Sequence, residues 1–312
     1  MDFIKVLAFN NDKAVRETVI SSVLNYFLDP QGDHGLAGTL LERYLKAVRD
    51  QVSVIGDEFI SAVHAFPRSK DLRCTVTSEW EGISDSEHKG RRLDSLVTIR
   101  YRDKIILLGT EVKIYGKSSS DDEQLGCYVK MLNEMRKELS EEENLPLESI
   151  YPILCYLIPN DSAKGFQFAR EAETECMKYG VEGVVIVKWS KSSAGSVSEK
   201  VKATTESMEE MILSVLHAYQ DGDISPADSQ AIDLLRSLRN AAINRFVFTP
   251  PVYRKEGQFP TNAQYEEALS PFQFALLSAF RDAVKAAGVT RPLAANTRHT
   301  SIGVPAGNNP AK

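Results

Sequence analysis

An almost wholly apolar segment at residues 150–158 sets the fold class of this chain. It does not alternate between apolar and polar side chains, as a strand with one face in water does. It is also too short to cross a membrane as a helix, which takes about 20 apolar residues. The segment therefore predicts a strand buried on both faces, and such strands occur where helices cover both sides of a sheet. We accordingly expect an α/β fold.

Other segments show the spacing of helices or strands on both sides of this buried strand. Helical periodicity predicts helices at about 12–28, 36–52, 123–139, 165–179, 206–219, 227–245 and 262–287. Strand signals lie at 72–80, 93–99, 105–114 and 184–189, with a tight polar turn at 102–104. This order of elements predicts a mixed central sheet flanked by helices.

The domain organisation is predicted from changes of character along the chain. A small polar linker occupies residues 190–196, and the pattern changes again near Asp221. We expect a main domain at 1–220, a helical extension at 221–290 and a flexible tail at 291–312, where apolar periodicity is weak.

Charge and cysteine content narrow the class of protein. The net charge of −6 and the pI near 5.6 argue against a protein that coats nucleic acid with a uniformly basic surface, although a local groove can still be basic. The four cysteines form no Cys-x-x-Cys pair, so neither a disulfide framework nor a zinc site is indicated. With no long apolar run and no signal peptide, we expect a cytoplasmic protein that does not bind membranes.

Three ionisable side chains converge at one end of the predicted hairpin. If the strands are paired outward from the turn, the numbers of opposite residues add up to about 205 or 206. Asp94 then lies opposite Glu111 or Val112. Glu111 and Lys113 are two residues apart, so both side chains point to the same face of the sheet. We therefore expect Asp94, Glu111 and Lys113 to lie close together.

This arrangement suits the hydrolysis of phosphodiester bonds. Two carboxylates that are forced together repel each other, and a divalent cation relieves that repulsion. Ligands that are all oxygen favour Mg²⁺ or Mn²⁺ over zinc. The ammonium group of Lys113 can orient the attacking water or help to deprotonate it. The alternative is that Asp94 and Lys113 form an ordinary cross-strand ion pair on a solvated face.

The same residues resemble the active-site motif of the PD-(D/E)XK nuclease superfamily. Asp94 is followed after 17 residues by Glu111-Val112-Lys113, although Leu93 stands where the proline in the family's name would be. The resemblance spans about residues 12–190. It implies a restriction-endonuclease-like α/β fold, here with a C-terminal helical extension, in which Asp94 and Glu111 bind the metal and Lys113 acts on the water.

A second motif resembles the Gln-x-x-x-Tyr signature of RecB-like members of this superfamily. Gln124 and Tyr128 are four residues apart on a predicted helix, so they project from one face of it. The resemblance implies that both belong to the catalytic set and touch either the substrate backbone or the lysine. The alternative is a tyrosine packed in the core and a solvated glutamine.

Further site residues follow from the resemblance. Glu17, on the helix before the sheet, resembles an additional acidic metal ligand of the family; the alternative is a solvated glutamate favoured in the first turns of a helix. Residues 25–30 and the His34-Gly35-Leu36 loop are similar to the opening of a bacterial subgroup, which implies a phosphate contact for His34. The alternative is a loop histidine that is structural or merely exposed. Basic residues near the expected cleft could bind the nucleic-acid backbone: Arg92 and Lys117, with Lys89 and Arg91.

Together these features predict a Mg²⁺-dependent nuclease, with Mn²⁺ able to substitute, whose expected substrate is DNA. The sequence leaves open DNA against RNA and endonuclease against exonuclease. The resemblance suggests a role in bacterial, antiviral defence against foreign DNA. Two alternatives stay open: a catalytically inactive nuclease-fold module that binds nucleic acid or a protein, and a repair or recombination nuclease that acts on junctions or ends. The C-terminal helices could form a homodimer or bind an accessory protein.

Overall fold

The computed structural model describes residues 15–82, 91–115, 124–160, 162–191, 203–224 and 227–246, together with Ile4 and two short strands near the C-terminus. The chain divides into two compact units. One comprises Glu17–Phe246, and the other comprises Met1–Arg16 with Val247–Lys312. The candidate site lies in the first unit.

A five-stranded mixed sheet forms the centre of the Glu17–Phe246 unit. Its strands lie side by side in chain order: β1 (Leu72–Trp80), β2 (Leu93–Tyr101), β3 (Lys104–Val112), β4 (Ile150–Ile158) and β5 (Val184–Lys188). The first three form an antiparallel meander, whereas β3, β4 and β5 run parallel. The mixed sheet expected from the sequence is therefore confirmed, and β4 is buried along almost its whole length.

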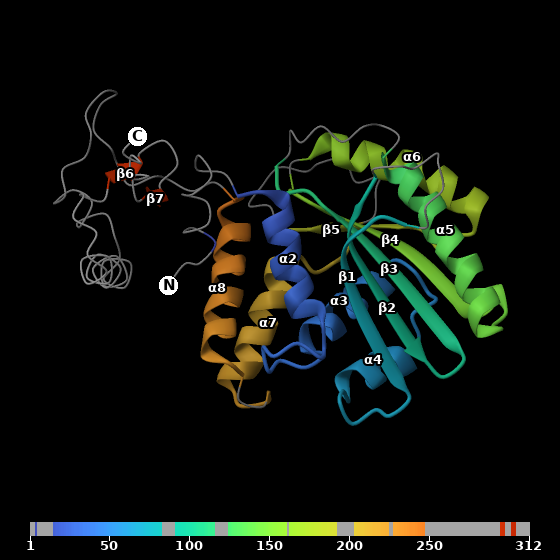
Figure 1. The fold of residues 1–312 in the computed structure, drawn as a ribbon, viewed down its shortest axis with the longest axis horizontal. Coiled ribbons are helices and arrows are strands. Elements are labelled where there is room, and N and C mark those ends of the chain that lie inside the picture. Colours follow the sequence, from blue (N-terminus) through green and yellow to red (C-terminus); the bar gives the residue numbers. More distant parts are fainter. Residues whose placement is uncertain are drawn as a thin grey trace, which may run out of the picture. The chain divides into compact units, whose positions relative to one another are not determined.

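Helices cover both sides of this sheet, as the apolar β4 segment requires. α5 (Gln124–Glu143) and α6 (Ala163–Tyr179) lie together on one side (Figure 1). The other side holds α2 (Glu17–Leu28), α3 (Thr39–Arg49) and α7 (Met208–Gln220), together with α8 (Ser229–Ile243), while α4 (Asp57–His64) follows α3. A 3₁₀ turn, Leu147–Ser149, leads into β4.

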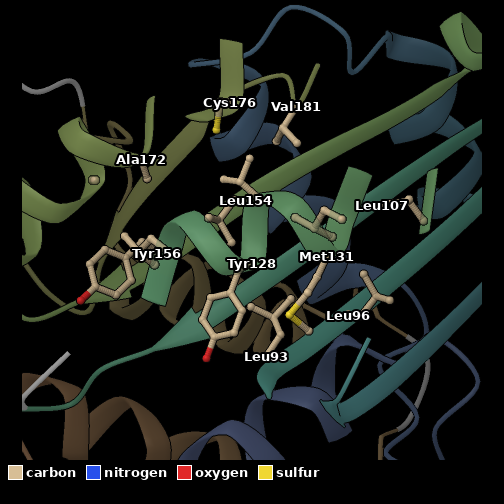
Figure 2. Close-up of a cluster of buried hydrophobic side chains, with 14 of the residues drawn as sticks. Leu93, Leu96, Leu107, Tyr128, Met131, Leu154, Tyr156, Ala172, Cys176 and Val181 are labelled. Atoms are coloured by element: carbon tan, nitrogen blue, oxygen red, sulfur yellow. The ribbon is translucent and has the colours of Figure 1, made fainter. Parts of the chain in front are cut away.

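The main hydrophobic core lies between the sheet and the helices α5 and α6. Figure 2 shows how side chains from both layers meet there: Leu93, Leu96 and Leu107 from the sheet, and Tyr128 and Met131 from α5. Gly109 of β3 allows this close packing, because a Cβ atom at that position would lie 2.6 Å from Leu93 Cδ2. The core therefore fixes α5 directly over the strands that carry the candidate site.

Helix boundaries differ from the sequence predictions more than strand boundaries do. α2 begins at Glu17 rather than at residue 12, since Val15 and Arg16 are not helical and residues 12–14 lie outside the described part. α3 begins at Thr39 rather than at residue 36, because the preceding loop is held by hydrogen bonds to His34. The short helix α4 was not predicted; its eight residues give little periodicity.

The predicted helical extension falls only partly within the described residues. α8 packs against α7 and α2 inside the Glu17–Phe246 unit. The helix expected at 262–287 lies outside the described residues, and in the expected tail the strands β6 (Ala294–Asn296) and β7 (Ser301–Gly303) pair antiparallel. The boundary near Asp221 stays a prediction. Among the described residues, no helix is long and apolar enough to cross a membrane.

Candidate active site

Asp94 and Glu111 meet where the pairing between β2 and β3 ends. Ladder partners in these strands add up to 205, as predicted, and the last pair is Ser95 with Thr110. Beyond that pair, a side chain takes the place of a backbone acceptor: Oδ2 of Asp94 accepts a hydrogen bond of 2.7 Å from the backbone N–H of Val112. The side chain of Asp94 is thereby fixed beside the end of β3.

Glu111 is buried, with only 2% of its surface exposed, although it is an ionisable residue. Its Oε1 atom lies 2.7 Å from Lys113 Nζ, whereas its Oε2 atom has no hydrogen-bond partner among the described residues. Burial, together with the nearby charge of Asp94, raises the pKa of Glu111 to about 8. Burial also raises the pKa of Asp94 to about 6. In both groups burial is the main cause of the raised pKa, and the charge of Lys113 offsets only part of it.

Lys113 follows directly after β3, and its ammonium group lies between two carboxylates. Nζ is 2.7 Å from Glu111 Oε1 and 3.4 Å from Glu17 Oε2. Burial alone would lower the pKa of Lys113, but the carboxylates of Glu111 and Glu17 outweigh that effect and raise it. The lysine is therefore held in its charged form.

Glu17, the first residue of α2, reaches the site from the helix layer. Its Oε1 atom accepts a hydrogen bond of 3.2 Å from the N–H of Ile114, and its Oε2 atom faces Lys113. Glu17 thus contacts the lysine and the end of β3, and in this structure it does not join Asp94 and Glu111 in a three-carboxylate group. Within the described part of the chain, no three His, Cys, Asp or Glu side chains are grouped closely enough to hold a metal.

The donor set nevertheless fits a divalent cation held by two protein carboxylates. Asp94 and Glu111 offer only oxygen atoms, and the unpartnered, buried Oε2 atom of Glu111 is an acceptor that a cation would satisfy. Burial raises the pKa values of both groups, and a bound cation would favour their ionised forms. Mg²⁺ commonly binds through one or two carboxylates and keeps several waters.

From α5, Gln124 and Tyr128 support the ends of β2 and β3 that carry Asp94 and Glu111. Gln124 Nε2 donates to Glu111 Oε1 at 3.0 Å and also lies 2.7 Å from the Tyr128 hydroxyl. That hydroxyl donates to the carbonyl oxygen of Arg92, two residues before Asp94. Because Tyr128 is only 1% exposed, it does not line a substrate groove. The motif was expected to touch the substrate or the lysine, whereas here it orients Glu111 and anchors the start of β2.

Comparison with known proteins agrees with this geometry. The family model of the PD-(D/E)XK nuclease superfamily matches residues 6–212, which is more than half of the chain. This chain belongs to the PD-(D/E)XK nuclease superfamily. No curated protein and no solved structure gives a significant match.

The superfamily match covers His34, but the structure does not support a phosphate contact there. His34 is fully buried and packs edge-on against Tyr26. Its Nδ1 atom accepts a hydrogen bond from the N–H of Leu36, so Nε2 carries the proton and donates to the carbonyl of Asp29 at 2.8 Å. Burial lowers the pKa of His34, in keeping with a neutral ring. The residue closes the loop between α2 and α3 with both ring nitrogens engaged, as the structural alternative predicts, and the phosphate contact stays a prediction.

The basic residues expected around the nuclease site are only partly described. The Arg92 side chain is 54% exposed and pairs with two glutamates at the end of β1, Glu81 at 2.8 Å and Glu79 at 3.8 Å. Exposed pairs of this kind contribute little to stability and are easily exchanged for other partners. Arg92 therefore remains available as a substrate contact. Lys117 and Lys89 lie outside the described residues, and Arg91 is engaged in a further interaction.

Two residues next to the superfamily motif were missed in the sequence. Asn25 of α2 is buried, and its amide nitrogen donates to the carbonyl of Asp94 at 3.1 Å and to Ser78 Oγ at 2.9 Å. With Glu17 and Ser21 it forms a polar stripe at four-residue spacing on one face of α2, which could have been recognised. Trp189 donates from its indole N–H to the carbonyl of Lys113 at 2.9 Å, and no local pattern indicates that long-range contact.

Proposed function

We propose that this chain is a divalent-metal-dependent nuclease that hydrolyses phosphodiester bonds in DNA, with Mg²⁺ as its metal. One observation carries the proposal: Asp94, Glu111 and Lys113 meet at the ends of paired strands, and a buried carboxylate oxygen of Glu111 has no partner among the described residues. Membership of a nuclease superfamily supports the reaction class. The intact acidic and lysine positions argue against an inactive binding module.

Each site residue has a role in this proposal that follows from its contacts. Asp94 and Glu111 would hold the cation, which when bound supplies a positive charge that polarises the phosphoryl oxygen. Lys113, held in its charged form, donates hydrogen bonds that orient the attacking water and offset negative charge developing on the phosphate. Gln124 keeps Glu111 in place, and Glu17 keeps Lys113 in place.

The choice of DNA and of a defensive role rests on the resemblance to a bacterial subgroup of these nucleases. Residues 25–30 and 34–36 resemble a bacterial subgroup of these nucleases, from which we extend the proposal to cleavage of foreign DNA. Protection of a bacterial host against phage, scored as plaque number with wild type and with Asp94→Asn, tests that role. Equal plaque numbers for the two chains would contradict the defensive role, but they would not bear on the proposed hydrolysis of phosphodiester bonds.

The test of the chemistry is a substrate panel with the purified full-length chain. Supercoiled plasmid, linear duplex, single-stranded DNA and RNA are each incubated with Mg²⁺, Mn²⁺ or a chelator. We expect cutting of DNA that needs either cation and that Asp94→Asn and Glu111→Gln lower by about 100-fold or more. Cleavage of circular plasmid identifies an endonuclease. Cutting of RNA alone would overturn the substrate, and cutting that persists in the chelator would overturn the metal.

A further inference from the structure

The backbone carbonyl of Lys113 lies at a gap in the β-ladder. β3 and β4 run parallel, and each residue of β3 lies opposite the residue of β4 whose number is 45 higher, as Val112 does with Leu157. Lys113 continues this pattern, because its N–H donates to the carbonyl of Leu157 at 2.8 Å. The next donor to the Lys113 carbonyl should be the N–H of residue 159. That residue is Pro159, which has no N–H.

Trp189, the residue directly after β5, supplies the missing donor. Its indole Nε1–H donates to the Lys113 carbonyl at 2.9 Å, and its side chain is 2% exposed. A buried carbonyl without a donor is unfavourable, so this contact replaces a ladder bond rather than adding to one. The catalytic lysine is thus held by β4 through its N–H and by Trp189 through its carbonyl.

The indole is itself fixed on several sides. The backbone N–H of Trp189 donates to the carbonyl of Ile158 at 3.1 Å. The carbonyl of Trp189 accepts a hydrogen bond of 2.9 Å from the backbone N–H of Glu209, at the start of α7. The ring of Phe246 packs edge-on against it, with ring centroids 4.9 Å apart. Phe246 follows α8 and is 1% exposed. The direction of the indole N–H is therefore set by packing that does not involve Lys113.

We propose that Trp189 is a positioning residue for Lys113, acting through a hydrogen bond that replaces the one Pro159 cannot make. This inference rests on the proposed nuclease function, because Lys113 matters only if it acts on the water or the phosphate. Trp189 does not touch the substrate. Losing its N–H lets the end of β3 shift, which lowers the rate of the chemical step while substrate binding is kept.

One substitution removes the hydrogen-bond donor to the Lys113 carbonyl, and a second substitution restores a donor at the same place. Trp189→Phe keeps an aromatic ring against Phe246 but removes the N–H, and we expect kcat to fall about tenfold with KM within about twofold. Pro159→Ala restores a backbone N–H at the ladder position. The double variant Trp189→Phe/Pro159→Ala should therefore have a kcat within about threefold of wild type. Pro159→Ala alone should have little effect on kcat. A purely structural role for the tryptophan predicts no such rescue.

A matched control and a second measurement keep the result decisive. Trp80→Phe removes the chain's other indole N–H and should leave kcat near that of wild type. Hydrogen exchange followed by mass spectrometry reports the protection of the Lys113 backbone amide without any need for activity. We expect protection to drop in Trp189→Phe and to return in the double variant.

The outcomes separate this inference from the proposed function. If wild type cuts DNA and Trp189→Phe cuts equally well with unchanged exchange at Lys113, the positioning role is overturned and the nuclease stands. A drop in kcat that Pro159→Ala does not repair also contradicts the inference, since the N–H is then not what matters. If wild type cuts no substrate while exchange responds as expected, the nuclease proposal fails and only the structural hydrogen bond is supported.

Discussion

At the scale of single residues, the buried carboxylates Asp94 and Glu111 make the stability of the metal-free protein depend on pH. Their pKa values of about 6 and about 8 exceed the ordinary values of 3.8 and 4.5. Below the ordinary values, both the folded and unfolded chains are protonated, and no cost arises. As pH rises towards the folded-state values, the unfolded chain releases its protons first, so these groups lower the free energy of unfolding.

This linkage predicts that Mg²⁺ stabilises the protein more strongly at pH 8 than at pH 5. The cation binds the ionised carboxylates and therefore competes with protons for them. Thermal melting with and without Mg²⁺ across this pH range measures the effect, and Glu111→Gln should abolish most of it. A stabilisation that is independent of pH, or largest in acid, would count against metal binding by these two groups.

His34 gives a prediction that separates a structural role from a substrate contact. His34→Ala removes two buried hydrogen bonds and leaves a cavity beside Tyr26, so we expect the free energy of unfolding to fall by about 2–4 kcal/mol. Cleavage per folded molecule should stay near that of wild type. Urea denaturation and cleavage by the same sample measure both. Unchanged stability with lost cleavage would instead support the phosphate contact expected from the sequence.

The sequence placed the central residues well because the hairpin fixes them locally. The short turn sets which residues of β2 and β3 lie opposite each other, so Asp94 and Glu111 could be brought together by counting. The roles of Asn25 and Trp189 depend on contacts between elements far apart in the chain. Those contacts follow from packing, which residue spacing does not determine.

At the scale of elements, α7 is held at its N-terminus by reciprocal hydrogen bonds. Ser207 Oγ accepts from the N–H of Glu210, and the carboxylate of Glu210 accepts from the N–H of Ser207. Ser207→Ala should therefore lower the free energy of unfolding by about 1 kcal/mol. Urea denaturation should show a lower midpoint with an unchanged slope. Ser207→Asp retains a side-chain acceptor, so its free energy of unfolding should fall by less. An equal fall in both variants would show that capping is not the cause.

Strands were predicted more closely than helices for a physical reason. β1 and β4 agree with the sequence prediction at both ends, because apolar runs bounded by polar turns define a strand directly. Helix ends depend on capping and on the preceding loop, as at Thr39, where the loop closed by His34 delays the start of α3. The eight-residue helix α4 is too short for its periodicity to stand out.

At the scale of the whole molecule, the position of α8 decides where the folded nuclease unit ends. Its buried side chains, including Ile232, Leu235 and Leu238, belong to the Glu17–Phe246 unit. The sequence pattern placed a boundary near Asp221 because the character of the chain changes there. A pattern of that kind shows that a helix is amphipathic, but it does not show which neighbour covers the apolar face.

Two truncated chains test where the unit ends. A chain that stops after Phe246 keeps α8 and the contact between Phe246 and Trp189, so we expect one cooperative melting transition close to that of the full chain. A chain that stops after Gly222 exposes the faces of α7 and α2 that α8 covers, and it should melt at a clearly lower temperature. Equal melting of the two chains would instead place the boundary near Asp221.

The central claim is that Lys113, with Asp94 and Glu111, forms the active site of a metal-dependent nuclease. The most direct measurement compares plasmid cleavage in Mg²⁺ by wild type, Lys113→Met and Lys104→Met. Lys104, at the other end of β3, pairs with Glu58 on the surface and is the matched control. We predict that Lys113→Met loses about 100-fold or more of the cleavage rate while it stays folded, and that Lys104→Met cuts like wild type. Cleavage by folded Lys113→Met at the wild-type rate would contradict the claim.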